Sequence, residues 1–296
     1  MASSALSIKF WGVRGSLAAP GPYACRYGGN TSCVEIRLPD GQRLIFDAGS
    51  GIRELGHSLS DGGERLKAHI FITHYHWDHI QGFPFFMPAY HQENQLVILG
   101  PKNPQRGIEQ IMATLMESVF FPVSFHEMGA EIQCQELVAG GDYPFGEAIV
   151  QTALMNHPGS ALGYSLLCNG LKIVYISDNE LVPRTWQGRD EKPFPYEVDQ
   201  REAVAHFVRG ADLLIHDAQY TDEDYEDRVG WGHSSWGETL QLAIENEVKN
   251  LAFYHFDPDY SDHLLDQMMT RCWSKVRHSG ISLNCFAARE NMEIPF

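Results

Sequence analysis

The chain has 296 residues, of which 44% are hydrophobic and 20% charged, an ordinary globular composition that excludes a wholly disordered protein. Its 38 acidic residues outnumber its 22 basic ones, which gives a formal net charge of −16. Surfaces that bind long nucleic acid or anionic lipid need clustered Lys and Arg, so we expect neither partner. A small anionic substrate remains compatible with this charge if cations at the site offset it locally.

The cysteines and the start of the chain bear on location. The six cysteines form no C-x-x-C pair, which argues against a zinc ribbon or a thioredoxin-like site. In a chain of this length we expect them to be reduced thiols. The segment MASSALSIKF lacks the pattern of a signal peptide, and no apolar run approaches the roughly 20 residues of a membrane span. We therefore predict a cytoplasmic protein with no membrane partner.

Short runs of β-branched and aromatic residues, bounded by Gly, Pro, Asp or Asn, predict strands along the chain. They dominate the first hundred residues, from SIKFWGV at 7–13 to QLVILG at 95–100. Later, Asn-Gly in CNGLK predicts a hairpin between two such runs. Helical periodicity predicts helices at 107–120, 199–210, 234–248 and 261–280.

This order of elements predicts a layered α/β or α+β fold, with sheets inside and helices outside, and we expect a single domain spanning 1–296. Residues 101–130 are irregular and rich in Pro, Met and Phe, which fits an insertion, a lid or a self-association surface. Within them, the first predicted helix places an apolar stripe on one face, which we assign to the core: Ile108, Ile111, Leu115 and Val119. The apolar stretches 84–90 and 108–125 are compatible with a homodimer.

The segment THYHWDH, residues 73–79, directly follows an apolar strand and concentrates metal-binding side chains: His74, His76, Asp78 and His79. Imidazole nitrogens and carboxylate oxygens are ligands that Zn²⁺ and similar ions prefer. If the segment is a strand ending in a loop, the first two histidines point to the same side and can bind one ion. The other two residues then lie at the turn, where they can reach a second ion.

Three further candidate ligands stand at predicted strand ends: His157, Asp178 and His255. Taken singly, each could be a capping Asp or a core His, but site residues often collect at such positions. With the first segment they complete two ligand sets. One set is His74, His76, His157 and Asp178, and the other is Asp78, His79, Asp178 and His255. We expect two divalent metal ions bridged by Asp178, with Zn²⁺ foremost and Mn²⁺ or Fe²⁺ as alternatives.

These ligands resemble the pattern of the metallo-β-lactamase superfamily: H-x-H-x-D-H, then a lone His, a strand-ending Asp and a late His. The resemblance spans nearly the whole chain, because YGGNTSCVEI and LIFDAGSGI are similar to the superfamily's N-terminal strands. It implies a four-layer αββα sandwich and a role for Asp47 in supporting the metal loop. YISDNE, ADLLIHDAQYTDEDY and GWGHSS look like a branch of metal-dependent hydrolases near ribonuclease Z and cyclic nucleotide phosphodiesterases.

The branch implies a chemistry. In the ribonuclease Z-like group a Gly-His-Ser motif supplies a general acid that a carboxylate orients, and the matching residues here are His233 and Asp217. His216 is adjacent, but strand alternation places its side chain on the opposite face from Asp217. The alternative for His233 is a loop histidine among tryptophans. We hypothesise that two metals activate a water, that Asp78 helps hold or deprotonate it, and that His233 protonates the leaving group of a phosphodiester.

The sequence lacks a long Gly- and Lys-rich insertion like the arm with which ribonuclease Z members hold transfer RNA. We therefore expect a small phosphodiester, such as a cyclic nucleotide. Phe83, Phe85 and Phe86 could form a wall of a base pocket or belong to the core. Two other functions stay open: a hydrolase of thioesters or lactones on the same fold, which would not need His233, and a non-enzymatic metal-binding module, which would usually lose ligands.

Overall fold

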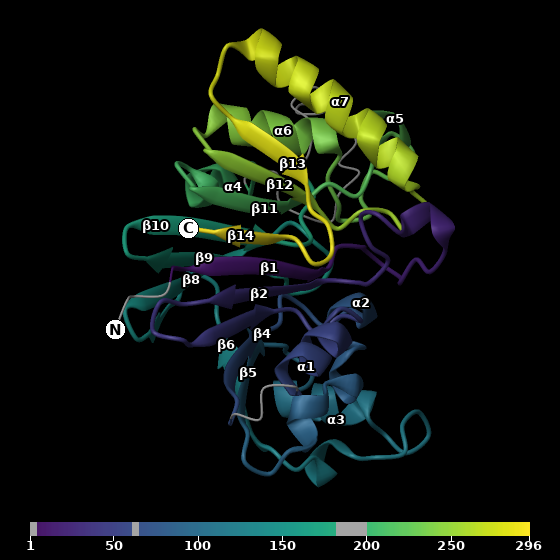
Figure 1. Ribbon diagram of the computed structural model, residues 1–296, viewed down its shortest axis with the longest axis vertical. Helices are drawn as coiled ribbons and strands as arrows, with labels where there is room; N and C mark the ends of the chain where they lie inside the picture. The colour runs from purple at the N-terminus through teal and green to yellow at the C-terminus, as the bar shows by residue number, and fades with distance from the viewer. Residues whose placement is uncertain (1–4, 61–64, 182–199) are drawn as a thin grey trace. The chain divides into compact units, whose positions relative to one another are not determined.

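The computed structural model describes residues 5–60, 65–181 and 200–296 (Figure 1). The chain forms two compact units, and each unit is built from segments that are not contiguous in the sequence. Unit 1 contains Met1–Pro20, Gly28–Val138 and Arg289–Phe296, and unit 2 contains Gly21–Tyr27 and Ala139–Ala288. That residues 1–296 act as a single domain stays a prediction.

The strands of unit 1 form a mixed sheet in the order β14-β1-β2-β3-β4-β5-β6. Their bounds are β1 (Ser7–Gly12), β2 (Cys33–Arg37), β3 (Arg43–Phe46), β4 (Lys67–Phe71), β5 (Gln95–Pro101), β6 (Glu131–Leu137) and β14 (Glu293–Pro295). The strands from β3 to β6 run parallel, whereas β14, β1 and β2 pair antiparallel. The loops after β3 and β4 therefore leave the sheet at the same edge.

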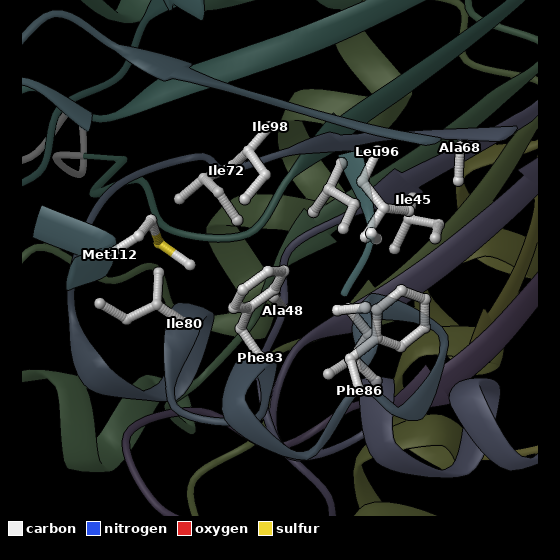
Figure 2. Packing of buried hydrophobic residues seen from close by; sticks show 14 of the residues in the cluster. Ile45, Ala48, Ala68, Ile72, Ile80, Phe83, Phe86, Leu96, Ile98 and Met112 are labelled. Carbon is white, nitrogen blue, oxygen red and sulfur yellow. The ribbon is translucent and has the colours of Figure 1, made fainter. Parts of the chain in front are cut away.

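Short helices of unit 1 pack against this sheet: α1 (Ile52–Ser60), α2 (Trp77–Ile80), η2 (Phe83–Phe85), η3 (Met87–Tyr90), α3 (Ile108–Leu115) and η4 (Phe125–Glu127). Figure 2 shows Ile80 and Phe83 in the same buried cluster as Ile72, which follows β4, and Ile98 of β5. Phe83 and Phe86 are fully buried in this cluster, as the core alternative predicts, whereas Phe85 is 53% exposed.

The 101–130 segment contributes to this core, because Met112, Met116 and Phe125 are buried. The predicted apolar stripe is only partly correct. Helix α3 ends at Leu115, since Met116 leaves the helical region (φ −109, ψ 22). The register therefore changes after two turns, and Val119 is 83% exposed rather than buried.

The strands of unit 2 form a second mixed sheet in the order β13-β12-β11-β10-β9-β8-β7. Their bounds are β7 (Asp142–Phe145), β8 (Ala148–Leu154), β9 (Leu162–Cys168), β10 (Leu171–Ile176), β11 (Leu213–Asp217), β12 (Asn250–Tyr254) and β13 (Asn284–Ala287). The predicted hairpin joins β9 to β10, with positive φ at Asn169 and Gly170, as a type I′ turn requires. The strands β10 to β13 run parallel, so their carboxyl ends share one edge.

The helices of unit 2 are η1 (Pro22–Ala24), α4 (Gln200–Val208), α5 (Asp222–Tyr225), α6 (Trp236–Glu245) and α7 (Asp262–Ser279). Two predicted helices begin at serine caps: Ser235 accepts from Glu238 N, and Ser261 accepts from Leu264 N. Helices α6 and α7 lie on one face of the sheet (Figure 1). The predicted start of α4 at Asp199 lies outside the described residues.

No disulfide links the six cysteines, all of which lie in the described part of the chain. Among the described helices, none combines the length and apolar character needed to cross a membrane. The cytoplasmic location stays a prediction.

Candidate metal centre

The first group of predicted ligands, here called the loop cluster, consists of His74, His76, Asp78 and His79 in unit 1. It occupies the loop after β4 and the short helix α2, at the edge of the sheet where parallel strands end. Strand β4 ends at Phe71, so residues 72–76 are irregular rather than the strand that we expected. Three of the four side chains are buried, and His76 is exposed.

The loop cluster divides into the two pairs that the sequence predicts. His74 Nε2 lies 2.9 Å from His76 Nδ1. His79 Nε2 lies 3.0 Å from Asp78 Oδ2. Ring nitrogens and carboxylate oxygens that converge at such distances are typical of groups able to share a cation. The irregular loop therefore achieves the pairing that we expected from strand alternation.

Asp47, fully buried after β3, holds this loop in place. Its carboxylate accepts hydrogen bonds from Thr73 N at 2.8 Å and from Thr73 Oγ1 at 3.0 Å. His79 Nδ1 lies 2.9 Å from Asp47 Oδ2, which makes Nδ1 the protonated nitrogen and presents Nε2 as the ligand atom. Asp47 adopts φ +61, a conformation uncommon for a non-glycine residue, at the point where β3 gives way to the loop. This geometry is the one that we expect of a residue supporting a metal loop.

Unit 1 contributes a second support that the sequence analysis missed. Ser16, with φ +60, donates its backbone N–H to Asp78 Oδ2 at 2.8 Å. These residues are 62 positions apart, and nothing in the WGVRGS segment indicates the contact before the sheet is formed.

The second group, here called the strand-end cluster, consists of His157, Asp178, His233 and His255 in unit 2. Asp178 follows β10 and His255 follows β12, so both leave the sheet at the shared edge of the parallel strands. Asp178 meets two histidines: its Oδ1 is 3.4 Å from His255 Nε2, and its Oδ2 is 3.7 Å from His157 Nε2. Ligand atoms of His157, Asp178 and His233 lie within 4.8 Å of one another.

His233 and Asp217 lie together as the resemblance implies. His233 Nδ1 is 3.0 Å from Asp217 Oδ2, and Asp217 is fully buried. The backbone N–H groups of Asn179 and Gln219 also donate to this carboxylate, at 3.1 and 2.9 Å. The carboxylate is therefore fixed, and it orients the imidazole so that Nε2 is directed away from it.

His216 takes a different position from its neighbour, as strand alternation predicts. Its Nδ1 lies 2.7 Å from the backbone oxygen of Asp217, and 3.3 Å from Thr239 Oγ1 on α6. Burial lowers the pKa of His216, which favours the neutral ring. This histidine has a structural environment, and the side chain that contacts His233 is that of Asp217.

Glu180 is a residue at this site that the sequence analysis missed. Its buried carboxylate accepts from Tyr225 Oη at 2.7 Å and from the backbone N–H groups of Gly230 and Gly232 at 2.8 and 2.9 Å. Burial raises its pKa. The carbonyl of Gly232 in turn accepts from His157 Nδ1 at 2.8 Å, which presents His157 Nε2 as the ligand atom.

The same loop needs glycine at position 232. Gly232 has φ +91, and a Cβ there would lie 2.5 Å from His157 Nδ1. Glu180, Gly232 and His157 thus form a chain of contacts from a buried carboxylate to a predicted ligand. In the sequence, the Gly-x-Gly pattern of GWGHSS could have indicated a constrained loop here. It does not indicate that Glu180 accepts hydrogen bonds from Gly230 and Gly232.

The donor set of both clusters fits divalent metal ions. Each contains imidazoles and carboxylates, the ligands that suit Zn²⁺, Mn²⁺ and Fe²⁺. His79 and His157 each use Nδ1 for a hydrogen bond inside the protein, as metal-binding histidines usually do.

Residues 42–256 match a family model described as "Beta-lactamase superfamily domain". Similar curated proteins include the ribonuclease Z of Methanosarcina mazei, which is 27% identical over 87% of this chain and 89% of that protein. The ribonuclease Z of Brevibacillus brevis is 26% identical over 79% of this chain and 81% of its own length.

Solved structures show the same fold. The metallo-β-lactamase fold protein YhfI from Bacillus subtilis aligns with a TM-score of 0.67 at 16% identity, over 99% of this chain and 100% of that one. The short form of human tRNase Z aligns with a TM-score of 0.65 at 20% identity, over 97% and 98%. The predicted α+β metallo-β-lactamase fold is confirmed.

The comparisons also correct one expectation. We expected no long nucleic acid as a partner, but the similar curated proteins are named for an activity on RNA. The expectation was wrong because net charge is a property of the whole surface, whereas phosphates are bound by local cations and metal ions. The family match over residues 42–256 shows that the chain belongs to the β-lactamase superfamily, as a metal-dependent hydrolase.

Proposed function

We propose that the protein is a phosphodiesterase that hydrolyses a nucleotide phosphodiester, with His233 as general acid. The observation that carries the proposal is the His233–Asp217 pair, in which Nδ1 lies 3.0 Å from a fully buried carboxylate oxygen. An alkoxide leaving group departs slowly unless it is protonated, so a phosphodiesterase benefits from a positioned acid. A hydrolase of thioesters or lactones would not need it.

The proposal assigns two divalent ions to the predicted ligands. One set is His74, His76, His157 and Asp178, and the other is Asp78, His79, Asp178 and His255. This assignment follows from the sequence motifs, and the paired distances inside each cluster support it. Bound divalent ions would supply Lewis acidity, which lowers the pKa of water and offsets charge on phosphoryl oxygens. Zn²⁺ is proposed first, with Mn²⁺ and Fe²⁺ as alternatives.

The side chains have distinct roles in this proposal. His233 donates through Nδ1 to Asp217, so its Nε2 carries the proton that is delivered to the leaving oxygen. The Asp217 carboxylate stabilises the imidazolium before transfer. Asp78, fixed by the N–H of Ser16, is assigned to hold or deprotonate the attacking water.

RNA is the first substrate class to test, because relatives named ribonuclease Z match 87% of the chain. A cyclic nucleotide is the second candidate, and the net charge of −16 favours it, since a small diester needs few cationic contacts. Both substrates contain the same phosphodiester bond to an alkyl oxygen. The proposed acid is therefore required for both.

The test compares His233→Ala with the wild-type protein on two diesters. On a ribonucleotide diester we expect turnover to fall by about 10²–10⁴, the usual contribution of a general acid. On a p-nitrophenyl diester, whose leaving group needs no proton, the loss should be much smaller. His263→Ala removes an exposed histidine from α7 and serves as the control. Equal losses on the two diesters would rule out the acid role.

A substrate panel then separates the remaining functions. Chelated protein is reloaded with Zn²⁺ or Mn²⁺ and offered an RNA oligonucleotide, a cyclic nucleotide, a thioester and a lactone. We expect hydrolysis of a nucleotide diester. Hydrolysis of the thioester or lactone alone would replace the proposal, and metal binding without any hydrolysis would favour the non-enzymatic module.

A further inference from the structure

A pocket of about 430 Å³ lies in unit 1 beside the loop cluster. Its first wall belongs to the metal loop and α2, with Tyr75, Trp77 and Ile80. Its second wall comes from α3 and the turn that follows it, up to Phe120. The volume falls within the roughly 300–1,000 Å³ of pockets that bind small molecules.

Two large aromatic side chains of this pocket are exposed to solvent. Trp77 is 76% exposed and Phe120 is 73% exposed. Exposed aromatic groups that line one concave surface mark a binding site more often than isolated ones do. The flat face of an aromatic ring stacks on any nucleobase, with little dependence on sequence.

Trp77 and Phe120 of this pocket do not belong to the core cluster of unit 1. On α3, Met112 is fully buried against the sheet, whereas Ile111 and Leu115 are only partly buried and line the pocket. Because α3 ends at Leu115, Phe120 is carried beyond the helix to the pocket wall. Ile111 and Leu115 thus pack against the core and also line the pocket.

Arg106 adds a positive charge to the pocket. Its guanidinium lies 3.4 Å from Thr114 Oγ1, another residue of the lining. Within the described ranges, no carboxylate lies in ion-pair distance of it, whereas the exposed Arg65 of the same unit pairs with Glu93 at 3.0 Å. In a protein of net charge −16, such a cation beside aromatic walls suits a ligand that is both aromatic and anionic.

One pocket residue, Trp77, is adjacent in the sequence to two predicted metal ligands. Trp77 stands between His76 and Asp78, and α2 buries Asp78 while it exposes Trp77. A ligand on the Trp77 ring is therefore held by the residue next to two predicted metal ligands. This position suits a part of the substrate close to the reacting bond.

We infer that this pocket binds one nucleotide of the substrate, with its base against Trp77 and Phe120 and a phosphate at Arg106. The inference rests on the proposed phosphodiesterase function and deepens it, because it names a nucleotide subsite and the side chains that form it. It distinguishes substrates that carry a base from diesters that do not.

The first experiment measures binding without catalysis. Adenosine 5′-monophosphate is titrated into the full chain by calorimetry, for wild type, Phe120→Ser and Arg106→Gln. Each variant should weaken binding by about tenfold, the order expected for one stacked base or one phosphate contact. Arg65→Gln and Ile149→Ser remove a surface cation and an exposed apolar side chain elsewhere and should change binding less than about twofold.

The second experiment separates KM from kcat on a dinucleotide and on its abasic counterpart. Phe120→Ser should raise KM for the dinucleotide about tenfold and leave kcat within about twofold, with no change on the abasic diester. Arg106→Gln should raise KM on both diesters, because both keep the phosphate. Equal effects of Phe120→Ser on both diesters, or unchanged nucleotide binding in both variants, would overturn the pocket while leaving phosphodiester hydrolysis intact. If the wild type cleaves neither diester, the proposed function fails, and the binding experiment still decides the pocket.

A second copy of the chain is the competing occupant. Sedimentation of wild type and Phe120→Ser gives the oligomeric state of each. Loss of a dimer in Phe120→Ser, with adenosine 5′-monophosphate binding unchanged, would assign the surface to self-association and overturn the inference.

Discussion

The loop cluster and the strand-end cluster reach similar donor sets in opposite ways. The loop cluster takes its four ligands from six consecutive positions, so local chain geometry brings them together. The strand-end cluster draws residues from positions 157 to 255. Asp178 and His255 follow the parallel strands β10 and β12, whereas His157 follows β8 and His233 lies in the loop before α6. The first depends on a loop conformation, and the second depends on the topology of a sheet.

Their supports differ in the same way. Asp47, one residue after β3, holds the loop cluster through Thr73 and His79. The strand-end cluster has several supporting carboxylates, because each of its side chains comes from its own segment: Asp217 holds His233, and Glu180 holds the loop that contacts His157. Substitutions can test whether the two clusters serve one reaction and how much each support contributes.

The largest effect is expected from removing one ligand of each cluster. If both clusters serve one centre, His79→Ala and His255→Ala should each lower turnover by about a thousandfold or more, since bound metal contributes several kcal/mol to transition-state stabilisation. Metal content, measured by plasma mass spectrometry, should fall in both variants. Loss of activity in one variant with full activity in the other would show that only one cluster is catalytic.

Asp47→Asn tests the single support of the loop cluster. Asn keeps the shape but loses the charge that fixes His79 as an Nδ1–H donor, so we expect metal affinity to weaken about 10–100-fold. Competition with a chromophoric chelator measures this change. Glu35→Gln provides the control, because Glu35 is a buried carboxylate of the same unit that pairs with Arg43. If both substitutions weaken metal binding equally, Asp47 acts through stability of the unit alone.

Glu180→Gln tests a support of the strand-end cluster. A neutral side chain cannot satisfy three donors as well as a carboxylate, so we expect a loss of about 1–3 kcal/mol in the free energy of unfolding. Turnover should fall by about tenfold as His157 loses its fixed orientation. Urea denaturation and steady-state kinetics measure the two effects. Glu223→Gln, which breaks an exposed ion pair with Arg271, should cost less than about 1 kcal/mol.

The smallest effect concerns His216. Burial lowers the pKa of His216 below its usual 6.5, so the unfolded chain binds a proton that the folded protein does not. The free energy of unfolding should therefore fall as the pH drops below about 6.5. In His216→Gln this part of the pH dependence should vanish, as urea denaturation between roughly pH 5 and 8 would measure. If the pH dependence of the free energy of unfolding is the same in His216→Gln as in the wild type, folding does not remove a proton from His216.

The sequence predicts the loop cluster more directly than the strand-end cluster, and the reason is physical. Ligands at positions 74–79 have a spacing that can be interpreted without a fold. Asp217 and His233 could be assigned only through a resemblance, because their 3.0 Å contact depends on where β11 ends. The sequence does not predict the contacts of Glu180 with Tyr225 and of Ser16 with Asp78, because the paired residues are 45 and 62 positions apart.

Two further expectations differ from the findings: the end of α3 and the absence of a long nucleic acid partner. The end of α3 was misjudged because the apolar periodicity continues to Val119, whereas packing of Met112 and Met116 fixes the helix at two turns. The expectation of no long nucleic acid was wrong because it rested on the net charge of the whole chain. A net charge gives no information about where individual cations such as Arg106 lie.

The strand β14 has a consequence for how the protein is made. Its residues Glu293–Pro295 pair with β1, so the last strand of the sheet in unit 1 joins the first (Figure 1). During translation the edge of β1 stays open until residues 289–296 have left the ribosome, long after the rest of unit 1 has been synthesised. An open strand edge is a template for pairing with other chains. A nascent chain stalled before residue 289 would therefore be a substrate for chaperones rather than a slightly shorter enzyme.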